Sequence, residues 1–354
     1  MKTPLVDRGS VERLLLLAGA LRAGLIDALA AGDAFSADEA ARAAETDPRA
    51  SRIVLEALVA EGVVERVTES HPAKVAARQG RARPPVGGAV DSAGGGGAID
   101  AGTAVRYRLS ALGRAHLVDE GPELERSGLL HQVNKLRGWL ELPEVIRTGR
   151  PLPRDPATHD LHSFVSAMGE RDTGVLDEIL ERCLAYAGPI RTMLDVGGAV
   201  GHVARHFSHC GARATLFDRE NVLPVAREFL GSEVADIALV GGDYTQSLPG
   251  GPFDLVYLGN VYHIYGPTTN ARVTREVFSI LSAGGTIAIQ DHVWGRSPRA
   301  ALFAVKMLQA TEEGGVWTEA EYRGWLADAG FGEVEVLDLQ TSGAQLILGR
   351  RPRP

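Results

Sequence analysis

The sequence has few cysteines: of 354 residues, only Cys183 and Cys210 carry a thiol. Two thiols cannot build a disulfide framework or a cysteine-based zinc site, and we expect no metal ion. So little cysteine is typical of a reducing compartment, so we expect a cytoplasmic protein.

The sequence also lacks excess positive charge and long hydrophobic runs. Its 45 acidic residues outnumber 37 basic ones, giving a formal net charge of -8 that does not attract nucleic acid or anionic membranes. The apolar stretch 14–31 contains Arg22 and Asp27 and has no basic leader before it. We therefore expect a buried helix there, and neither nucleic acid nor a membrane as a partner.

Hydrophobic residues are abundant, at 45%, and charged residues make up 23%, as in folded globular proteins. The length favours two domains. We predict the first over residues 1–120, where a helical pattern over 11–66 ends in a strand, a second strand follows at 105–109 and a helix at 112–118. Helices followed by two strands that pair as a hairpin are typical of a winged-helix domain.

Residues 70–103, between these two strands, are rich in Gly, Ala, Pro and Arg and lack periodicity. We predict a flexible, low-complexity insertion. Its first half is basic, with Lys74, Arg78, Arg81 and Arg83, so a nucleic-acid contact stays open beside the favoured interpretation of a solvated loop.

Residues 121–186 are predicted as connecting helices, interrupted by the proline-rich run GRPLPRDP at 149–156. From 187 to 354, apolar runs alternate with helix-length segments. The runs lie at 192–196, 214–217, 237–240, 255–258 and 286–289. This alternation predicts an α/β domain with a parallel sheet covered on both faces.

The last two predicted strands, 333–339 and 345–348, are too close in sequence for a crossover helix. They must be antiparallel neighbours. The fold class is therefore α/β, a Rossmann-like sheet that ends in an antiparallel C-terminal hairpin, preceded by the mainly helical winged-helix domain.

A glycine turn follows the first strand of the second domain, in DVGGAVGHVA. The strand ends in Asp195, and Gly197, Gly198 and Gly201 let the backbone turn tightly beside a ligand. Because position 199 is alanine, the G-x-G-x-x-G pattern of NAD-binding proteins is not met.

Polar residues also follow the next two strands. Asp218, 23 residues after Asp195, suits two ribose hydroxyls, while Asp243 and Tyr244 suit the amine and ring of a purine. Each aspartate alone could instead cap a helix or form an Asx turn. Together the three carboxylates and the glycines predict an adenosine-type ligand.

These motifs, followed by PFDLVYLGNVYHIY, LSAGGTIAIQD and WLADAGF in the same order, resemble those of class I S-adenosylmethionine (SAM)-dependent methyltransferases. The most similar family is that of plant and bacterial small-molecule O-methyltransferases of secondary metabolism. The resemblance covers nearly the whole chain except the insertion.

The resemblance implies SAM as cofactor and S-adenosylhomocysteine (SAH) as product. Asp195, Gly197, Gly198 and Gly201 would surround the methionine part, Asp218 the ribose, and Asp243 with Tyr244 the adenine; Asn260 completes this set. The N-terminal domain would form a homodimer and complete the acceptor pocket, which disfavours a DNA-binding regulator.

Two further residues are predicted to be catalytic. His263, after the fourth strand, matches the catalytic histidine of the family and suits proton removal from a hydroxyl near neutral pH. Asp291, at the end of the fifth strand, would orient it. Purely structural roles, a hydrogen bond to a loop for His263 and a helix cap for Asp291, stay open.

The sequence departs from the family at Val316 and Trp317, where plant relatives carry a second acidic residue. This admits two alternatives to O-methylation: transfer to sulfur, nitrogen or carbon, and a SAM-binding protein that no longer methylates. His292 is a candidate substitute base, for which a packing role is the favoured interpretation. The predicted acceptor pocket uses Phe164, Met168 and Arg171 from one helix, and Tyr262, Trp294, Met307 and Trp317 from later segments.

Overall fold

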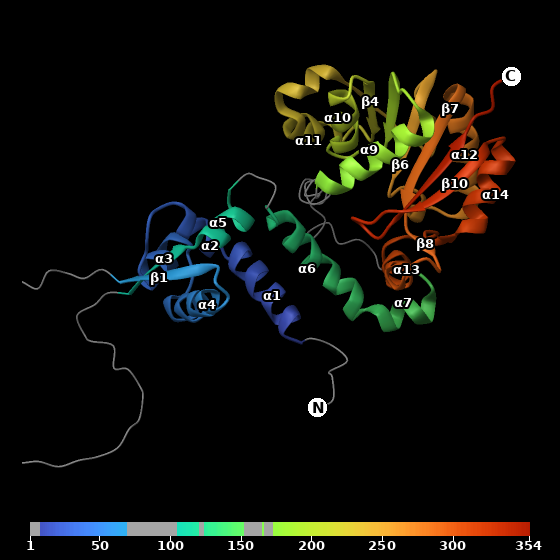
Figure 1. The fold of residues 1–354 in the computed structure, drawn as a ribbon. Helices are drawn as coiled ribbons and strands as arrows, with labels where there is room; N and C mark the ends of the chain where they lie inside the picture. The colour runs from blue at the N-terminus through green and yellow to red at the C-terminus, as the bar shows by residue number, and fades with distance from the viewer. Residues whose placement is uncertain (1–7, 69–104, 120–123, 152–164, 166–172) are drawn as a thin grey trace, which may run out of the picture. The chain divides into compact units, whose positions relative to one another are not determined.

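The computed structural model describes residues 8–68, 105–119, 124–151, 165 and 173–354 (Figure 1). The chain divides into two compact units, residues 1–124 and 125–354. The segment predicted as connecting helices belongs to the second unit. The predicted insertion at 70–103 lies outside the described residues.

The first unit is mainly helical, with one hairpin of two strands. Strands β1 and β2 pair antiparallel from Val64 opposite Leu109 to Thr68 opposite Val105, which confirms the predicted hairpin. Capping side chains mark the helix starts: Ser36 forms a capping box with Glu39. The elements are α1 (Arg8–Arg22), α2 (Leu25–Ala30), α3 (Ala37–Ala43), α4 (Pro48–Ala60), β1 (Val64–Thr68), β2 (Val105–Leu109) and α5 (Ala111–Leu117).

Helices also open the described part of the second unit. Helices α6 (Arg126–Leu140) and α7 (Leu142–Thr148) precede Gly149, which adopts φ 66° and ends α7, and α9 (Thr173–Ala187) leads into the sheet. The strands are β3 (Thr192–Val196), β4 (Arg213–Asp218), β5 (Ile237–Gly241), β6 (Phe253–Gly259), β7 (Leu281–Asp291), β8 (Val293–Trp294), β9 (Trp317–Thr318), β10 (Gly332–Asp338) and β11 (Gln345–Arg350). The remaining helices are α10 (His202–His209), α11 (Leu223–Leu230), the 3-10 turns η1 (Gly231–Asp236) and η2 (Tyr262–Ile264), α12 (Pro267–Ile280), α13 (Pro298–Ala310) and α14 (Glu319–Ala329).

Seven strands form one sheet in the order β10-β11-β7-β6-β3-β4-β5. Strands β3 to β7 pair in parallel, whereas β11 runs antiparallel to both β7 and β10. The predicted C-terminal hairpin is confirmed. Because β3 lies between β4 and β6, the strand order reverses there, and the carboxyl ends of these strands form the edge where α/β proteins bind ligands.

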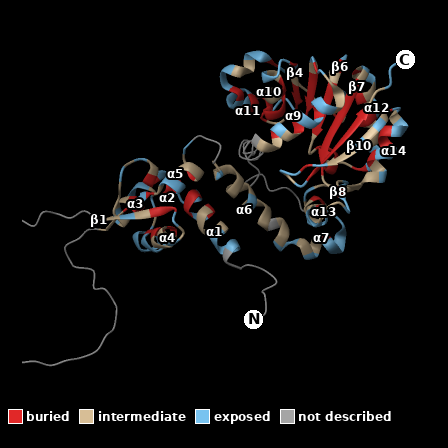
Figure 2. Cartoon of the chain, viewed as in Figure 1, coloured by how far each residue is buried: buried red, intermediate tan, exposed pale blue. Residues whose placement is uncertain are grey.

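Helices cover both faces of the sheet, and its strands are the most buried part of the unit (Figure 2). On one face, Met193 and Leu216 pack against side chains of α9, α10 and α11. On the other, Leu194 and Val256 pack against α12 and α14. Strand residues that alternate between two apolar layers explain why the sequence shows continuous apolar runs.

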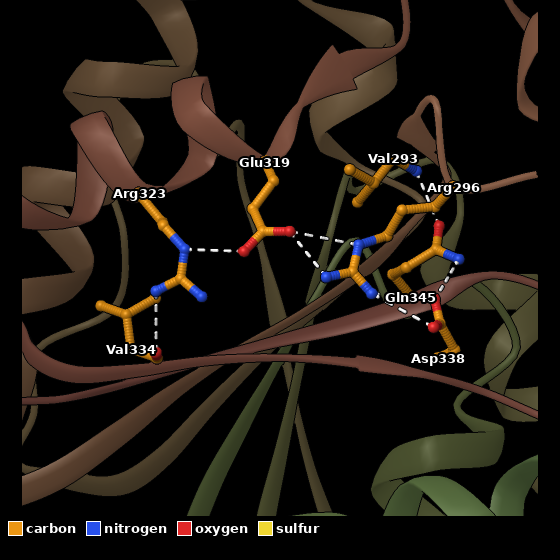
Figure 3. Close-up of polar contacts among 7 residues, drawn as sticks. All are labelled: Val293, Arg296, Glu319, Arg323, Val334, Asp338 and Gln345. Atoms are coloured by element: carbon orange, nitrogen blue, oxygen red, sulfur yellow. Dashed lines mark hydrogen bonds and ion pairs between the residues drawn. The ribbon is translucent and has the colours of Figure 1, made fainter.

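A network of charged side chains ties the segment after β7 to the last strands (Figure 3). Arg296 donates to Glu319 and to Asp338, and Gln345 donates to Asp338 at 2.9 Å. The Gln345 side chain also accepts from the backbone of Val293 at 2.8 Å. The backbone that follows Asp291 is thereby held against the sheet.

No helix in the described part of the chain combines the length and the apolar character that a membrane span requires.

Candidate active site

The turn after β3 has a backbone that excludes larger side chains. Gly197 and Gly201 adopt φ 68° and 85°, and a β-carbon at Gly198 would lie 2.7 Å from the Asp195 carboxyl group. Asp195 is buried and accepts a hydrogen bond from the backbone of Ala204 in α10 at 3.1 Å. The aspartate and the glycines therefore form one fixed turn, and Gly197, Gly198, Tyr257 and Gly259 line a small cavity beside it.

The carboxylate of Asp218, at the end of β4, reaches the same turn. It accepts hydrogen bonds from the backbone of Ala199 at 2.9 Å and of Arg219 at 2.7 Å. Burial raises the pKa of Asp218, although these two backbone donors counteract it. Each oxygen keeps a lone pair for a further donor.

Asp243 and Tyr244 follow β5 and differ in exposure. Asp243 is exposed, and one of its oxygens accepts from the backbone and the hydroxyl of Thr245, at 2.8 and 2.6 Å, in the Asx turn considered above. The Tyr244 ring is buried, packs edge-on against Tyr265 with centroids 5.7 Å apart, and lies near Gly197. The edge of the Tyr244 ring therefore adjoins the glycine turn, and Asp243 precedes it in the chain.

Asn260 follows β6 and adopts φ 59°, a left-handed conformation that asparagine tolerates better than most residues. Its backbone donates to the carbonyl of Gln290 at 2.8 Å. This bond joins the loop after β6 to the end of β7, where Asp291 lies.

His263 and Asp291 form a buried pair. The imidazole Nδ1 lies 2.8 Å from Asp291 Oδ1, and the His263 backbone donates to Oδ2 at 3.0 Å. Asp291 is fully buried and also accepts from the backbone of His292 at 2.8 Å. Since a carboxylate oxygen can only accept, Nδ1 is the donor in this hydrogen bond.

The segment after α13 holds the other side of His263. The Gly315 backbone donates to the His263 carbonyl at 3.0 Å, and a β-carbon at Gly314 would lie 2.3 Å from that oxygen. The histidine backbone is thus fixed between β7 and this glycine pair.

Comparison with known proteins identifies the family. The profile of the O-methyltransferase domain matches residues 154–332. The chain belongs to the O-methyltransferase family. It is a SAM-dependent methyltransferase that acts on small molecules.

Two curated proteins illustrate the range of similarity. The tetracenomycin polyketide synthesis 8-O-methyl transferase of Streptomyces glaucescens is 30% identical over 234 residues, 61% of this chain and 67% of the relative. The 3-hydroxy-5-methyl-1-naphthoate 3-O-methyltransferase of Streptomyces sahachiroi is 27% identical and covers 94% of this chain and 90% of its own.

Solved structures show the same fold. Human N-acetylserotonin methyltransferase in complex with SAM superposes with a TM-score of 0.72 at 19% identity, covering 99% of this chain and all of its own. PigF with SAH gives 0.71 at 20% identity, covering 98% and 100%.

The residues predicted to line the acceptor pocket of this O-methyltransferase lie in different surroundings. Tyr262 is fully buried in the core, where its hydroxyl contacts that of Thr274 at 2.8 Å. Trp317 packs beside it and donates to its carbonyl at 2.9 Å. Met307 is buried on α13, and the side chain of Trp294 is half exposed.

Phe164, Met168 and Arg171 lie outside the described residues. Among the residues that are described, no three His, Cys, Asp or Glu side chains are grouped as metal ligands.

Phe303, on α13, is a neighbour of the histidines that the sequence patterns did not single out. Its ring lies edge-on to His263, with centroids 4.8 Å apart, and 4.6 Å from the ring of His292. Burial lowers the pKa of His292, which favours its neutral form. In this O-methyltransferase, the Phe303 ring therefore contacts the imidazoles of both His263 and His292.

Proposed function

We propose that the glycine turn and the carboxyl ends of β3 to β6 hold SAM in this enzyme. Asp195, Gly197, Gly198 and Gly201 would take the methionine part, and Asp218 the ribose. The support is physical: β-carbons at Gly198 and Gly201 would lie 2.7 Å from Asp195 and 2.8 Å from Leu216, so the turn requires glycine, and the Asp218 carboxylate retains lone pairs for two hydroxyls.

The adenine would lie beside Tyr244, with Asp243 accepting from its exocyclic amine and Asn260 closing the loop after β6. The buried aromatic ring of Tyr244 next to Gly197 supports this assignment. Asp243 uses one oxygen in its turn with Thr245, so the second is available.

We propose that His263 is the general base for a hydroxyl acceptor. SAM, when bound, supplies a methyl group that its positive sulfur already activates. The protein contributes alignment and proton removal. His263 Nε2 would accept the hydroxyl proton, and Asp291 would hold the imidazole tautomer and stabilise the imidazolium.

One observation carries this proposal: the 2.8 Å contact between His263 Nδ1 and a carboxylate that is fully buried and accepts three hydrogen bonds. If Asp291 only capped a helix, it would not need to contact the imidazole of His263. It also works without the second acidic residue that Val316 and Trp317 replace.

We further propose that the acceptor is a hydroxylated aromatic compound. Relatives that take polyketide and naphthoate substrates support this class, and so does the Phe303 ring beside His263. A homodimer and a cytoplasmic location complete the proposal, the latter supported by two cysteines that form no disulfide.

The test is a methyl-transfer screen with radiolabelled SAM against 1-naphthol, 2-naphthol and the corresponding thiols and amines. We expect methyl ethers, identified by mass spectrometry. Products on sulfur, nitrogen or carbon would favour the alternative chemistry. SAM binding without any transfer would overturn the proposed function and favour a protein that no longer methylates.

A further inference from the structure

Lysine is rare in this chain. Of the 37 basic residues only four are lysine, at positions 2, 74, 135 and 306, and the rest are arginine. Lys135 lies on α6 and Lys306 on α13, far apart in sequence, yet the two side chains lie close enough for the charge of Lys306 to lower the pKa of Lys135. Two of the four lysines of the chain therefore lie together where α6 packs against α13.

The packing of α6 on α13 fixes this meeting. One turn beyond the lysines, Gly138 of α6 lies against Gln309 of α13, where a β-carbon would be 2.8 Å from the glutamine oxygen. The contact of Gly138 with Gln309 therefore lies three residues after the lysines on both α6 and α13 and keeps the two lysines close. The close approach of Gly138 makes this a tight crossing.

The pair lies next to the proposed base. The Lys306 ammonium is 5.1 Å from the centroid of the Phe303 ring, and that ring is 4.8 Å from the His263 imidazole. The ammonium is therefore no farther from the imidazole than the sum of these distances. A benzene or naphthalene ring with two substituents spans a gap of this order.

Positive charge outweighs negative charge here. Burial, followed by the positive charge of Lys306, lowers the pKa of Lys135 to about 7. Among the described residues no carboxylate pairs with either lysine, and Asp291, the nearby acid, already accepts three hydrogen bonds. Two adjacent amines without a carboxylate are costly for the folded protein.

Two buried polar atoms nearby also lack partners. Nε2 of Gln309 and Nδ1 of His292 form no hydrogen bond with the described residues. Buried polar atoms without a hydrogen-bond partner are uncommon in folded proteins. A polar ligand would supply the missing partners.

We infer that Lys135 and Lys306 bind the carboxylate of the methyl acceptor, so that the acceptor is an aromatic hydroxy acid whose hydroxyl reaches His263. This rests on the proposed function, because it names the substrate class of the same site. A carboxylate between the amines would remove their repulsion and accept a charge-assisted hydrogen bond from each. Phe303 would lie along the ring that joins the two substituents.

The inference carries a pH dependence. A bound carboxylate favours protonated Lys135, so acid affinity should fall as the pH rises through about 7, while the affinity of a neutral ester should stay constant. The charged groups on the packed elements are Lys306 and Arg299 on α13, Glu144 and Arg147 on α7, and beyond Phe303 the residues His263, Asp291 and His292. Glu144 and Arg147 pair with each other.

The experiment measures binding rather than transfer. The enzyme saturated with SAH is titrated with 3-hydroxybenzoate, 4-hydroxybenzoate and 6-hydroxy-2-naphthoate, each beside its methyl ester. We expect at least one acid to bind about tenfold or more tightly than its ester, and the variant Lys135→Met with Lys306→Met to lose this preference. Should the double variant not fold, each single variant should lose part of the preference.

Arg299→Met is the matched control, since Arg299 lies on the same helix but donates to the carbonyl of Ser342 at 3.2 Å. It should keep the preference within about twofold, and SAH affinity should not change in any variant. Acids and esters that bind equally, or a preference that survives in the lysine variants, would overturn the inference even if naphthols are methylated. Lysine-dependent acid binding without any methyl transfer would instead refute the proposed function alone.

Discussion

At the scale of single residues, two carboxylates of the site, those of Asp218 and Asp291, are buried and accept hydrogen bonds from the protein. Burial of a carboxylate is costly unless donors surround it, and Asp291 has three. Asp218 is the corresponding case beside the glycine turn, where its two donors belong to the backbone. Each carboxylate links the ends of two segments, so a conservative exchange tests its charge without removing its volume.

Asp291→Asn should slow methyl transfer about 10²- to 10⁴-fold, because an amide neither fixes the productive imidazole tautomer nor stabilises the imidazolium. SAH affinity, measured by calorimetry, should remain within about twofold, since Asp291 does not border the glycine turn. A rate close to that of the wild type would show that Asp291 acts as a structural residue.

Asp218→Asn should weaken SAH binding about tenfold or more, because the hydroxyls of the ribose lose a charged acceptor. Asp243→Asn is the matched comparison and should cost less, since Asp243 is exposed and uses one oxygen in its own turn. Calorimetry on both variants shows which exchange weakens SAH binding more. The reverse ranking would refute the ribose assignment.

At the scale of elements, the loop after α13 helps to position His263, the proposed base. Gly314 and Gly315 contact the His263 carbonyl from one side, while the end of β7 holds the residue from the other. The charged network around Arg296 in turn ties the backbone after β7 to β10 and β11. Movement of either support should therefore move the imidazole.

Gly314→Ala should reduce kcat with little change in SAH affinity, because the new β-carbon would meet a backbone oxygen at 2.3 Å and displace the His263 segment. Gly324→Ala is its control, in an exposed turn of α14 with nothing within 4 Å. That exchange should stabilise the fold by about 0.5–1 kcal/mol and leave activity intact. Thermal melting and steady-state rates separate the two, and equal kcat values would contradict the assigned role of the loop.

At the scale of the whole molecule, the proposed homodimer requires apolar side chains on the surface of each subunit. Helix α1 exposes Val11 and Leu15, four residues apart on one face, at 44% and 46%. In the proposed homodimer these two side chains would be covered by the second copy.

Sedimentation of the wild type should therefore give twice the chain mass of 37.6 kDa. The exchange of Val11→Glu with Leu15→Glu should shift the equilibrium toward the monomer, because buried charges are costly at such an interface. A wild type that sediments as a monomer at micromolar concentration would refute the homodimer.

The sheet and its edge could be predicted from sequence because both follow from local patterns. Continuous apolar runs mark parallel strands, and the short link before Gln345 requires an antiparallel partner. Residues directly after parallel strands meet at one edge, which is why Asp195, Asp218 and His263 could be placed near one another.

The acceptor side could not be predicted in the same way, because it depends on how helices pack. Tyr262 follows a strand as His263 does, yet its ring turns into the core, where its hydroxyl finds Thr274. Lys135 and Lys306 meet only through the crossing of α6 on α13, which no spacing encodes. The rarity of lysine in the sequence was the available signal.

The most direct test of the account is single-turnover methyl transfer by His263→Gln with an accepted aromatic hydroxyl compound. Glutamine keeps much of the volume and cannot take up the proton. We predict a rate at least about 10²-fold below that of the wild type, with SAH affinity unchanged. A variant that transfers methyl at the wild-type rate would contradict the assignment of His263 as the base.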